Sequence, residues 1–205
     1  MKTITTEEEL RAEIGHPGKL AEHKVIAHID QHCREFIAKS PFLIMSTSNN
    51  KGMCDSSPRG DSPGFVYVLD EKHVVIPERP GNRRADSILN IFENPHAGLL
   101  FLIPGLEETL RINGKASITS DSNLLNLFEV QGKLPKVAIV IEVEECFIHC
   151  AKALKRSSMW QPATWEDKEN LPSPAKMMAS HAKLPEYTEK AVNESLAESY
   201  TKRMY

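Results

Sequence analysis

The sequence has no run of apolar residues long enough to span a bilayer, which takes roughly 18 consecutive apolar residues. It also has no excess of basic residues, because 25 Lys and Arg stand against 28 Asp and Glu, a formal net charge of -3. A nucleic-acid-binding protein usually carries a basic surface. The two absences therefore predict no membrane span and no nucleic-acid partner, and any anion site has to come from a local cluster of cations.

Cysteine pairs of the C-x-x-C type are absent as well. The four cysteines are Cys33, Cys54, Cys146 and Cys150, and this spacing does not indicate a disulfide framework. The first ten residues are acidic and contain no apolar stretch typical of a signal peptide. Reduced thiols and a cytoplasmic location are the expectation.

The remaining composition is that of an ordinary globular protein, with 40% hydrophobic and 26% charged residues and no internal repeat. A length of 205 residues predicts a single domain. We divide it into an N-terminal helical segment (1–39), a core (40–160), and an extended connection with a C-terminal helix (161–205).

Alternation and β-branched residues predict mostly short strands joined by turns. The strand candidates are residues 42–48, 53–57, 65–69, 73–77, 97–104, 109–119 and 136–150. Helices are expected over residues 20–38, from about Asn82 to Asn94, over 124–128 and 151–160, and from about Pro185 onward. Because the turns between strands are too short for parallel crossovers, the pattern favours an α+β fold built on a small antiparallel barrel.

Residues Val137–Ile141 are apolar without alternation, which indicates a strand buried on both faces. In residues 20–38, apolar side chains recur every four residues, which is typical of an amphipathic helix. These side chains are Val25, Ile29, Cys33 and Ile37.

The turn between residues 76 and 95 (I-P-E-R-P-G-N-R-R-A-D-S) raises a question of charge. Arg83 and Arg84 fall in the predicted first turn of a helix, where the helix dipole is positive and a cation is unfavourable by about 0.3–1 kcal/mol. A phosphate bound at Gly81-Asn82 would account for them, since free helix-terminal amides and arginine forks both bind phosphate. The alternative is that they pair with Glu78 and Asp86 at the surface.

The same helix should present Ala85, Ile88, Leu89 and Phe92 as its apolar face. Arg79, just before the turn, has no ligand in this interpretation; pairing with Glu78 and exposure to solvent both stay open.

Four segments together resemble the pyridoxamine 5′-phosphate oxidase-like, FMN-binding split-barrel family. They are S-P-R-G-D (57–61), V-I-P-E-R-P-G-N-R-R-A-D-S (75–87), N-P-H-A-G-L-L-F-L-I-P-G (94–105) and E-T-L-R-I-N-G-K-A (108–116). The resemblance covers roughly residues 35–160 and is most specific at the G-N-R-R turn and the L-R-I-N-G-K-A strand.

The resemblance implies a six-stranded antiparallel split barrel and a homodimer with FMN at the interface. Arg59, Arg83 and Arg84 match the family's phosphate contacts, together with Ile76, Pro77 and Asn82 around the turn. Thr109 and Arg111 match positions at the isoalloxazine edge, and Lys152, Arg156 and Trp160 match late residues supplied by the partner chain. A cation near the reduced ring, Arg111 or Lys152, would stabilise its negative charge.

The segment after Trp165 has no counterpart of the tryptophan and arginine that serve the vitamin substrate in the oxidases themselves. Pyridoxamine phosphate is therefore not the expected substrate. The function expected is an FMN-dependent oxidoreductase that passes electrons between a reduced donor such as NAD(P)H and a small planar acceptor. No catalytic residue is assigned.

Two alternatives are kept. One is a deazaflavin-dependent reductase on the same barrel, and the other is a flavin- or haem-binding protein without turnover, for which His149 and His181 are the axial candidates. A metal site is not expected, because Cys146, His149 and Cys150 lack a second cluster with zinc-ligand spacing.

Overall fold

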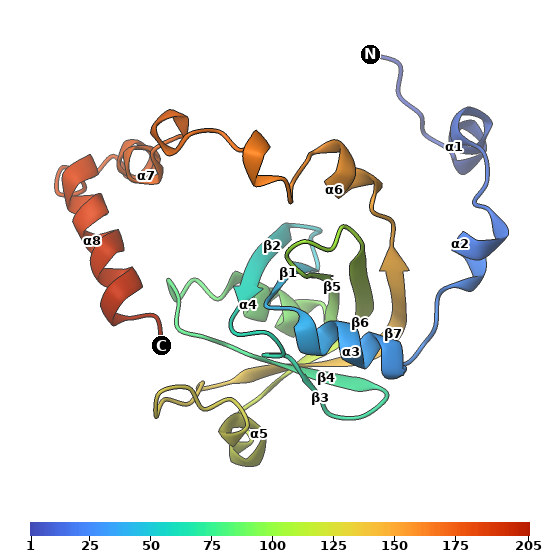
Figure 1. Cartoon of the computed structure of the whole chain (residues 1–205), viewed down its shortest axis with the longest axis horizontal. Helices are drawn as coiled ribbons and strands as arrows, with labels where there is room; N and C mark the ends of the chain where they lie inside the picture. The colour runs from blue at the N-terminus through green and yellow to red at the C-terminus, as the bar shows by residue number, and fades with distance from the viewer.

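The computed structural model describes all 205 residues and contains one seven-stranded sheet, in which every strand pair is antiparallel (Figure 1). The strands are β1 (Phe42–Ser48), β2 (Cys54–Gly60), β3 (Tyr67–Val68), β4 (His73–Pro77), β5 (His96–Leu102), β6 (Thr109–Thr119) and β7 (Ala138–His149). Their order across the sheet is β2-β1-β5-β6-β7-β4-β3. The predicted α+β class with an antiparallel sheet is confirmed. The count is seven rather than six strands, because the two residues of β3 pair with β4 as a separate edge.

The helices lie at the two ends of the chain and in the strand connections. They are α1 (Glu7–Ile14), α2 (Lys19–His23), α3 (Gln31–Lys39), α4 (Asp86–Glu93), α5 (Ser122–Asn126), α6 (Lys152–Arg156), α7 (Pro174–Ala182) and α8 (Glu189–Lys202). Two 3-10 turns, η1 (Pro162–Thr164) and η2 (Lys168–Asn170), interrupt the connection that was expected to be extended. Helix α7 was not anticipated.

The single helix predicted over residues 20–38 is in fact two helices, α2 and α3. Between them the backbone of Ile26 pairs with Cys146 of β7, through N–H···O bonds of 3.1 and 2.7 Å in the two directions. Asp30 then begins α3 as its N-cap, its carboxylate accepting from the amide of Cys33 at 2.8 Å. The pairing with a distant strand outweighs the local helical pattern, although Ile29, Cys33 and Ile37 are buried as the pattern requires.

The long pair β6–β7 forms the centre of the sheet and of the hydrophobic core. Nineteen buried residues form one cluster, which includes Ile139 and Ile141 of β7. The opposite face of β7, at Ala138, packs with Leu125 and Phe128 of the α5 region. The prediction that residues 137–141 are buried on both faces is therefore confirmed for this strand.

The two edges of the sheet are brought together by side chains rather than by backbone bonds. Arg59 of edge strand β2 pairs with Glu78, just after β4, and Asp61, just after β2, pairs with Arg79 at 2.7 Å. Since β2 and β4 lie on opposite sides of the sheet order, these pairs require the sheet to curl into a barrel whose gap is closed by ion pairs. We call these four residues the seam.

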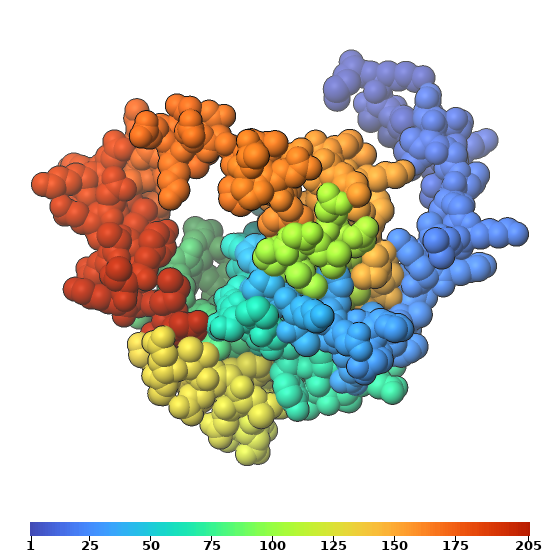
Figure 2. Space-filling view, in the orientation of Figure 1, coloured from blue at the N-terminus to red at the C-terminus, as the bar shows by residue number.

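The two ends of the chain form arms that extend from the barrel. Helices α1 and α2 bury no residue, whereas α7 and α8 bury one each, Ala175 and Val192. Figure 2 shows the C-terminal arm leaving the body at residue 150, arching around an open space and touching the body again near its end. No helix combines the length and the apolar character needed to cross a bilayer.

The register shift between β6 and β7 generates a first prediction: Asn113 pairs with Glu145 and Gly114 with Val143, so β7 carries one extra residue there. A Cβ added to Gly114 would collide with the carbonyl oxygen of Glu142 and lie 2.9 Å from its carbonyl carbon, in a sheet that cannot yield locally. We expect Gly114→Ala to lower the free energy of unfolding by about 3 kcal/mol, the upper end of ordinary overpacking costs. Urea unfolding followed by circular dichroism measures it.

Gly18→Ala is the matched control, because nothing lies within 4 Å of a Cβ at that position in the N-terminal arm. Equal stability of the two variants would contradict the close approach of β6 to β7.

Candidate functional site

A pocket of about 440 Å³ opens along the seam. Its walls come from Ser57–Gly60 at the end of β2, from the segment between Pro77 and Ser87, and from Met204 and Tyr205 at the end of the C-terminal arm. Within 77–87, Arg83 is the one residue that does not line it. A volume of this size falls in the range of small-molecule sites, about 300–1,000 Å³.

Arg59 is the central cation of the pocket. Its side chain is 13% exposed, and its Nη1 donates to Oε2 of Glu78. Its Nε is the one buried side-chain nitrogen or oxygen of the chain without a hydrogen-bond partner. A buried N–H group without an acceptor costs about 1–3 kcal/mol. This nitrogen is enclosed by the protein, so a ligand in the pocket would meet the exposed part of the Arg59 side chain instead.

The turn after β4 differs from the expected helix start. Helix α4 begins at Asp86 rather than near Asn82, because Arg83 and Ala85 adopt left-handed backbone conformations, with φ of 63° and 58°. Arg83 and Arg84 therefore precede the helix. The side chain of Asn82 accepts from the amide of Arg84 at 2.9 Å and fixes the turn.

The later start also rotates the helix. Ile91 is buried and Ile88 half-buried, whereas Leu89 and Phe92 are 56% and 69% exposed. The predicted apolar face is thus correct at Ile88 and wrong at Leu89 and Phe92.

This turn lines the pocket through Gly81, Asn82, Arg84 and Ala85, all of which are exposed. Among the amides of residues 81–85, that of Arg84 alone donates to a protein acceptor. The guanidinium of Arg84 is 71% exposed and pairs with Asp86 at 2.8 Å. Unpaired amides and a guanidinium beside one cavity form an environment that favours an anion with several oxygens.

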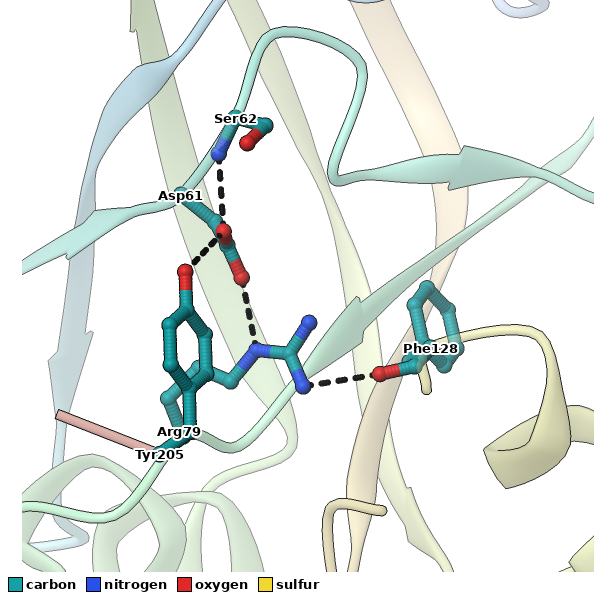
Figure 3. A network of polar contacts seen from close by, with 5 residues as sticks. All are labelled: Asp61, Ser62, Arg79, Phe128 and Tyr205. Carbon is teal, nitrogen blue, oxygen red and sulfur yellow. Dashed lines mark hydrogen bonds and ion pairs between the residues drawn. The ribbon is translucent and has the colours of Figure 1, made fainter. Parts of the chain in front are cut away.

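Arg79 and Asp61 form the more buried half of the seam (Figure 3). Arg79 donates from Nε to Asp61 and from Nη1 to the carbonyl of Phe128 at 2.8 Å, and Asp61 also accepts from Tyr205 Oη at 2.7 Å and from the amide of Ser62 at 2.8 Å. Burial raises the pKa of Asp61, but the bonds from Tyr205 and Ser62 and the charge of Arg79 outweigh it, and the pKa lies below its ordinary value. Asp61 is a fixed carboxylate at neutral pH.

The family model for pyridoxamine 5′-phosphate oxidase matches residues 29–150, well over half of the chain. The chain belongs to the pyridoxamine 5′-phosphate oxidase family. The match contains the whole sheet, the seam and the turn before α4, but it ends before the C-terminal arm.

Several solved structures are similar at low identity. HupZ of Group A Streptococcus is 19% identical with a TM-score of 0.48, covering 58% of this chain and 93% of that one. General Stress Protein 26 of Bacillus anthracis is 20% identical (TM-score 0.43, 58% and 94% covered), and an FMN-binding protein of Syntrophomonas wolfei is 11% identical (0.45, 70% and 96%). These similarities are too low to support an argument about a ligand. No curated protein sequence matches the chain.

Of the residues that the family resemblance nominates, the pocket brings together Arg59, Pro77, Asn82 and Arg84. Ile76 is fully buried in the core cluster.

The other nominated residues lie elsewhere. Thr109 is 6% exposed and opposite His149 in the β6–β7 ladder, and Arg111 stacks on the ring of Phe147 at 5.5 Å. Lys152 and Arg156 are exposed on α6, and Trp160 donates its indole N–H to the carbonyl of Leu106 at 2.9 Å. Their roles toward a cofactor stay predictions.

Four contributors to the site were not nominated from the sequence: Asp61, Glu78, Arg79 as a seam residue, and Tyr205. Asp61 lies inside the quoted S-P-R-G-D motif, so the motif itself carried a signal for it. Tyr205 lies 144 residues from its hydrogen-bond partner, and no local pattern links the two.

Cysteine and histidine form no metal site here. The chain contains no group of three or more His, Cys, Asp or Glu side chains that could hold an ion. Cys146 and Cys33 are buried with their sulfurs 3.3 Å apart, and both this contact and burial raise the pKa of the Cys146 thiol, which keeps it protonated.

The Tyr205–Asp61 bond generates a prediction on pH. The hydrogen bond to the carboxylate raises the pKa of Tyr205 above its ordinary value of about 10. Because the contact with Asp61 raises the pKa of Tyr205, the hydrogen bond stabilises the attached C-terminal arm fully at pH values below the ordinary pKa of tyrosine. This stabilisation is lost as the pH rises through the raised pKa. A pH titration of phenolate absorbance in wild type, minus the same titration in Tyr205→Phe, gives the midpoint of Tyr205 ionisation.

Asp61→Asn should bring this midpoint back toward the ordinary value, since the neutral amide does not oppose a phenolate. A midpoint that Asp61→Asn leaves unchanged would contradict the contact.

Proposed function

We propose that this chain is an FMN-dependent oxidoreductase of the cytoplasm, with the flavin phosphate bound in the seam pocket. The observation that carries the proposal is that Arg59 and Arg84 line one pocket together with the turn after Pro80, in which the amides of Gly81, Asn82 and Ala85 donate to no protein acceptor. Membership of the pyridoxamine 5′-phosphate oxidase family and four free cysteines, which suit a reducing compartment, support it.

The donors of the pocket fit a phosphate monoester. Arg59 lies in the wall, Arg84 lies at the rim, and the amides of the turn after Pro80 have no acceptor in the protein. Glu78 and Asp86 each occupy one side of an arginine, so they orient the guanidinium planes and leave other N–H groups for a ligand. Such a set binds a planar or tetrahedral oxyanion through directed, charge-assisted hydrogen bonds.

Two left-handed residues in the same turn give further support. Arg83 and Ala85 hold conformations that are unfavourable for residues with a Cβ, typically by about 1–3 kcal/mol each. Strain of this kind persists where the surrounding structure needs a particular backbone path. Here the path keeps the amides of Gly81, Asn82 and Ala85 out of the helix, in a segment that lines the pocket.

When bound, FMN would supply the redox chemistry, passing electrons between a reduced donor such as NAD(P)H and a small planar acceptor. The contribution of the chain is to fix the phosphate and to place donors along the ring. Arg111 projects from the face of β6 opposite to Leu110 and Ile112, which are fully buried in the core. Arg111 lies outside the pocket wall, so we assign it to a flavin held by a second copy of the chain. Thr109 lies on the same face of β6 but is only 6% exposed, so it would reach such a flavin only if the side chains that cover it moved.

A homodimer is accordingly part of the proposal. Leu89 and Phe92 leave an exposed apolar strip on α4, next to the pocket wall at Asp86 and Ser87. The C-terminal arm encloses an open space rather than packing on its own barrel (Figure 2). Apolar surface beside a site is typical of an interface between copies. Lys152, Arg156 and Trp160 of one copy would then approach the flavin of the other.

Colour is the first test. Purified protein reconstituted with FMN should show flavin absorbance at about 370 and 450 nm, and NADH or NADPH should bleach the second band if the flavin turns over. Failure to retain FMN would contradict the proposal. Retention of a deazaflavin instead would favour a reductase for that cofactor. A Soret band would favour haem, although His149 and His181 do not line the pocket.

Substitution of the arginines tests the phosphate assignment. We expect Arg59→Gln and the double variant Arg83→Ala/Arg84→Ala to weaken FMN binding by about tenfold to a hundredfold, because a hydrogen bond to a charged group contributes about 1.5–3 kcal/mol. Quenching of FMN fluorescence measures the dissociation constant.

The single variants of the double substitution provide a matched comparison. Arg84 lines the pocket and Arg83 does not, so Arg84→Ala should account for most of the loss. Unchanged affinity in both Arg59→Gln and the double variant would place the phosphate elsewhere.

A further inference from the structure

The end of the C-terminal arm lies in the wall of the same pocket, through Met204 and Tyr205. Residues 151–205 are outside the region matched by the family model, so this part of the wall is not part of the matched barrel. The contact joins two segments 144 residues apart in the sequence.

Three contacts hold Tyr205 in place, and Figure 3 shows the residues of the first two, Asp61 and Arg79. Its hydroxyl donates to Asp61 at 2.7 Å, its ring lies 5.3 Å from the guanidinium carbon of Arg79, and its backbone oxygen accepts from Lys133 Nζ at 2.7 Å. The side chain of Asp61 is only 3% exposed. A hydrogen bond to a buried carboxylate is among the stronger contacts a neutral side chain can make.

None of these contacts uses the donors assigned to the phosphate. Tyr205 bonds to Asp61 and rests on Arg79, whereas Arg59, Arg84 and the amides of Gly81, Asn82 and Ala85 make no hydrogen bond to it. A segment that blocked the pocket would be expected to satisfy those donors itself. Tyr205 closes one side of the cavity and leaves the donors available to a ligand.

The arm that carries Tyr205 can move without disturbing the barrel. Helix α8 buries only Val192, packs against α7 and is joined to the core through the connection containing η1 and η2. At the pocket the arm is attached through Met204 and Tyr205, and Figure 2 shows the end of the arm touching the body. Release of the Tyr205 contacts would open the pocket while the sheet and seam stay intact.

We propose that Tyr205 is a ligand-retaining latch: the C-terminal arm closes over the pocket, and the Tyr205 contacts with Asp61 and Arg79 slow the release of the bound flavin phosphate. The inference rests on the proposed FMN site. It assigns to Tyr205 a binding role that the family barrel does not contain.

The test is the dissociation rate of FMN. The FMN-loaded protein is mixed with an excess of a second protein that binds free FMN, and the release is followed by stopped-flow fluorescence. Tyr205→Phe removes the hydroxyl and keeps the ring, and Tyr205→Ala removes both. We expect the rate to rise about tenfold in the first, as for the loss of one hydrogen bond to a charged group, and further in the second. The association rate should change less.

Tyr200→Phe and Tyr200→Ala are the matched controls, because Tyr200 lies on α8 in the same arm, is 63% exposed and makes no side-chain hydrogen bond. Their dissociation rates should equal that of wild type. Thermal unfolding of all four variants should be unchanged at the barrel transition, since neither tyrosine belongs to the core cluster.

Each failure has its own signature. FMN bound by wild type and released at the same rate from both Tyr205 variants would overturn the latch and leave the flavin site standing. Faster association and tighter binding in the Tyr205 variants would also overturn it, because the arm would then be a competitor. If wild type and every variant fail to bind FMN, the proposed function fails, and the latch fails with it.

Discussion

The ion pairs of the seam are the interaction on which the site depends. Backbone hydrogen bonds hold the sheet from β2 to β3, but none joins β2 to β4, and Arg59–Glu78 and Asp61–Arg79 bridge that gap. Asp61 and Arg79 are 3% and 17% exposed, and breaking a buried pair by removal of one partner costs about 3–5 kcal/mol. The curl of the sheet and the position of the turn before α4 both follow from these contacts.

Closure by side chains also explains why the pocket lies where it does. A continuous ladder would have used the backbone groups and packed the space between the strands. At the seam the chain instead places three guanidinium groups, those of Arg59, Arg79 and Arg84, beside a turn with unpaired amides. The left-handed residues Arg83 and Ala85 keep those amides out of the helix, so the same turn that shortens α4 supplies donors to the cavity.

The sequence predicted the structural features that depend on local residue patterns, and it did not predict those that depend on contacts between distant segments. Strand β6 was predicted with its observed limits, Thr109–Thr119, because alternation and β-branched residues specify it locally. The division of the first long helix depends on Ile26 pairing with Cys146, and the role of Arg79 depends on Asp61, Phe128 and Tyr205. Arginine placement indicated an anion site near Gly81, but it could not distinguish Arg84, which lines the pocket, from Arg83, which does not.

The arginines of the pocket wall are each paired with a carboxylate, and this pairing determines which anions the pocket can bind selectively. Arg59 pairs with Glu78, Arg79 with Asp61, and Arg84 with Asp86, so every cation in the wall has its own carboxylate. Net attraction for polyanions is therefore small, and affinity has to come from the direction of particular N–H groups. In the proposed complex, a phosphate monoester would meet Arg59 and the turn amides together, whereas an anion that reaches only the rim would meet Arg84 already neutralised by Asp86. Selectivity by direction rather than by charge also suits a chain whose overall charge is -3, because a small phosphorylated ligand can be held without an electropositive surface.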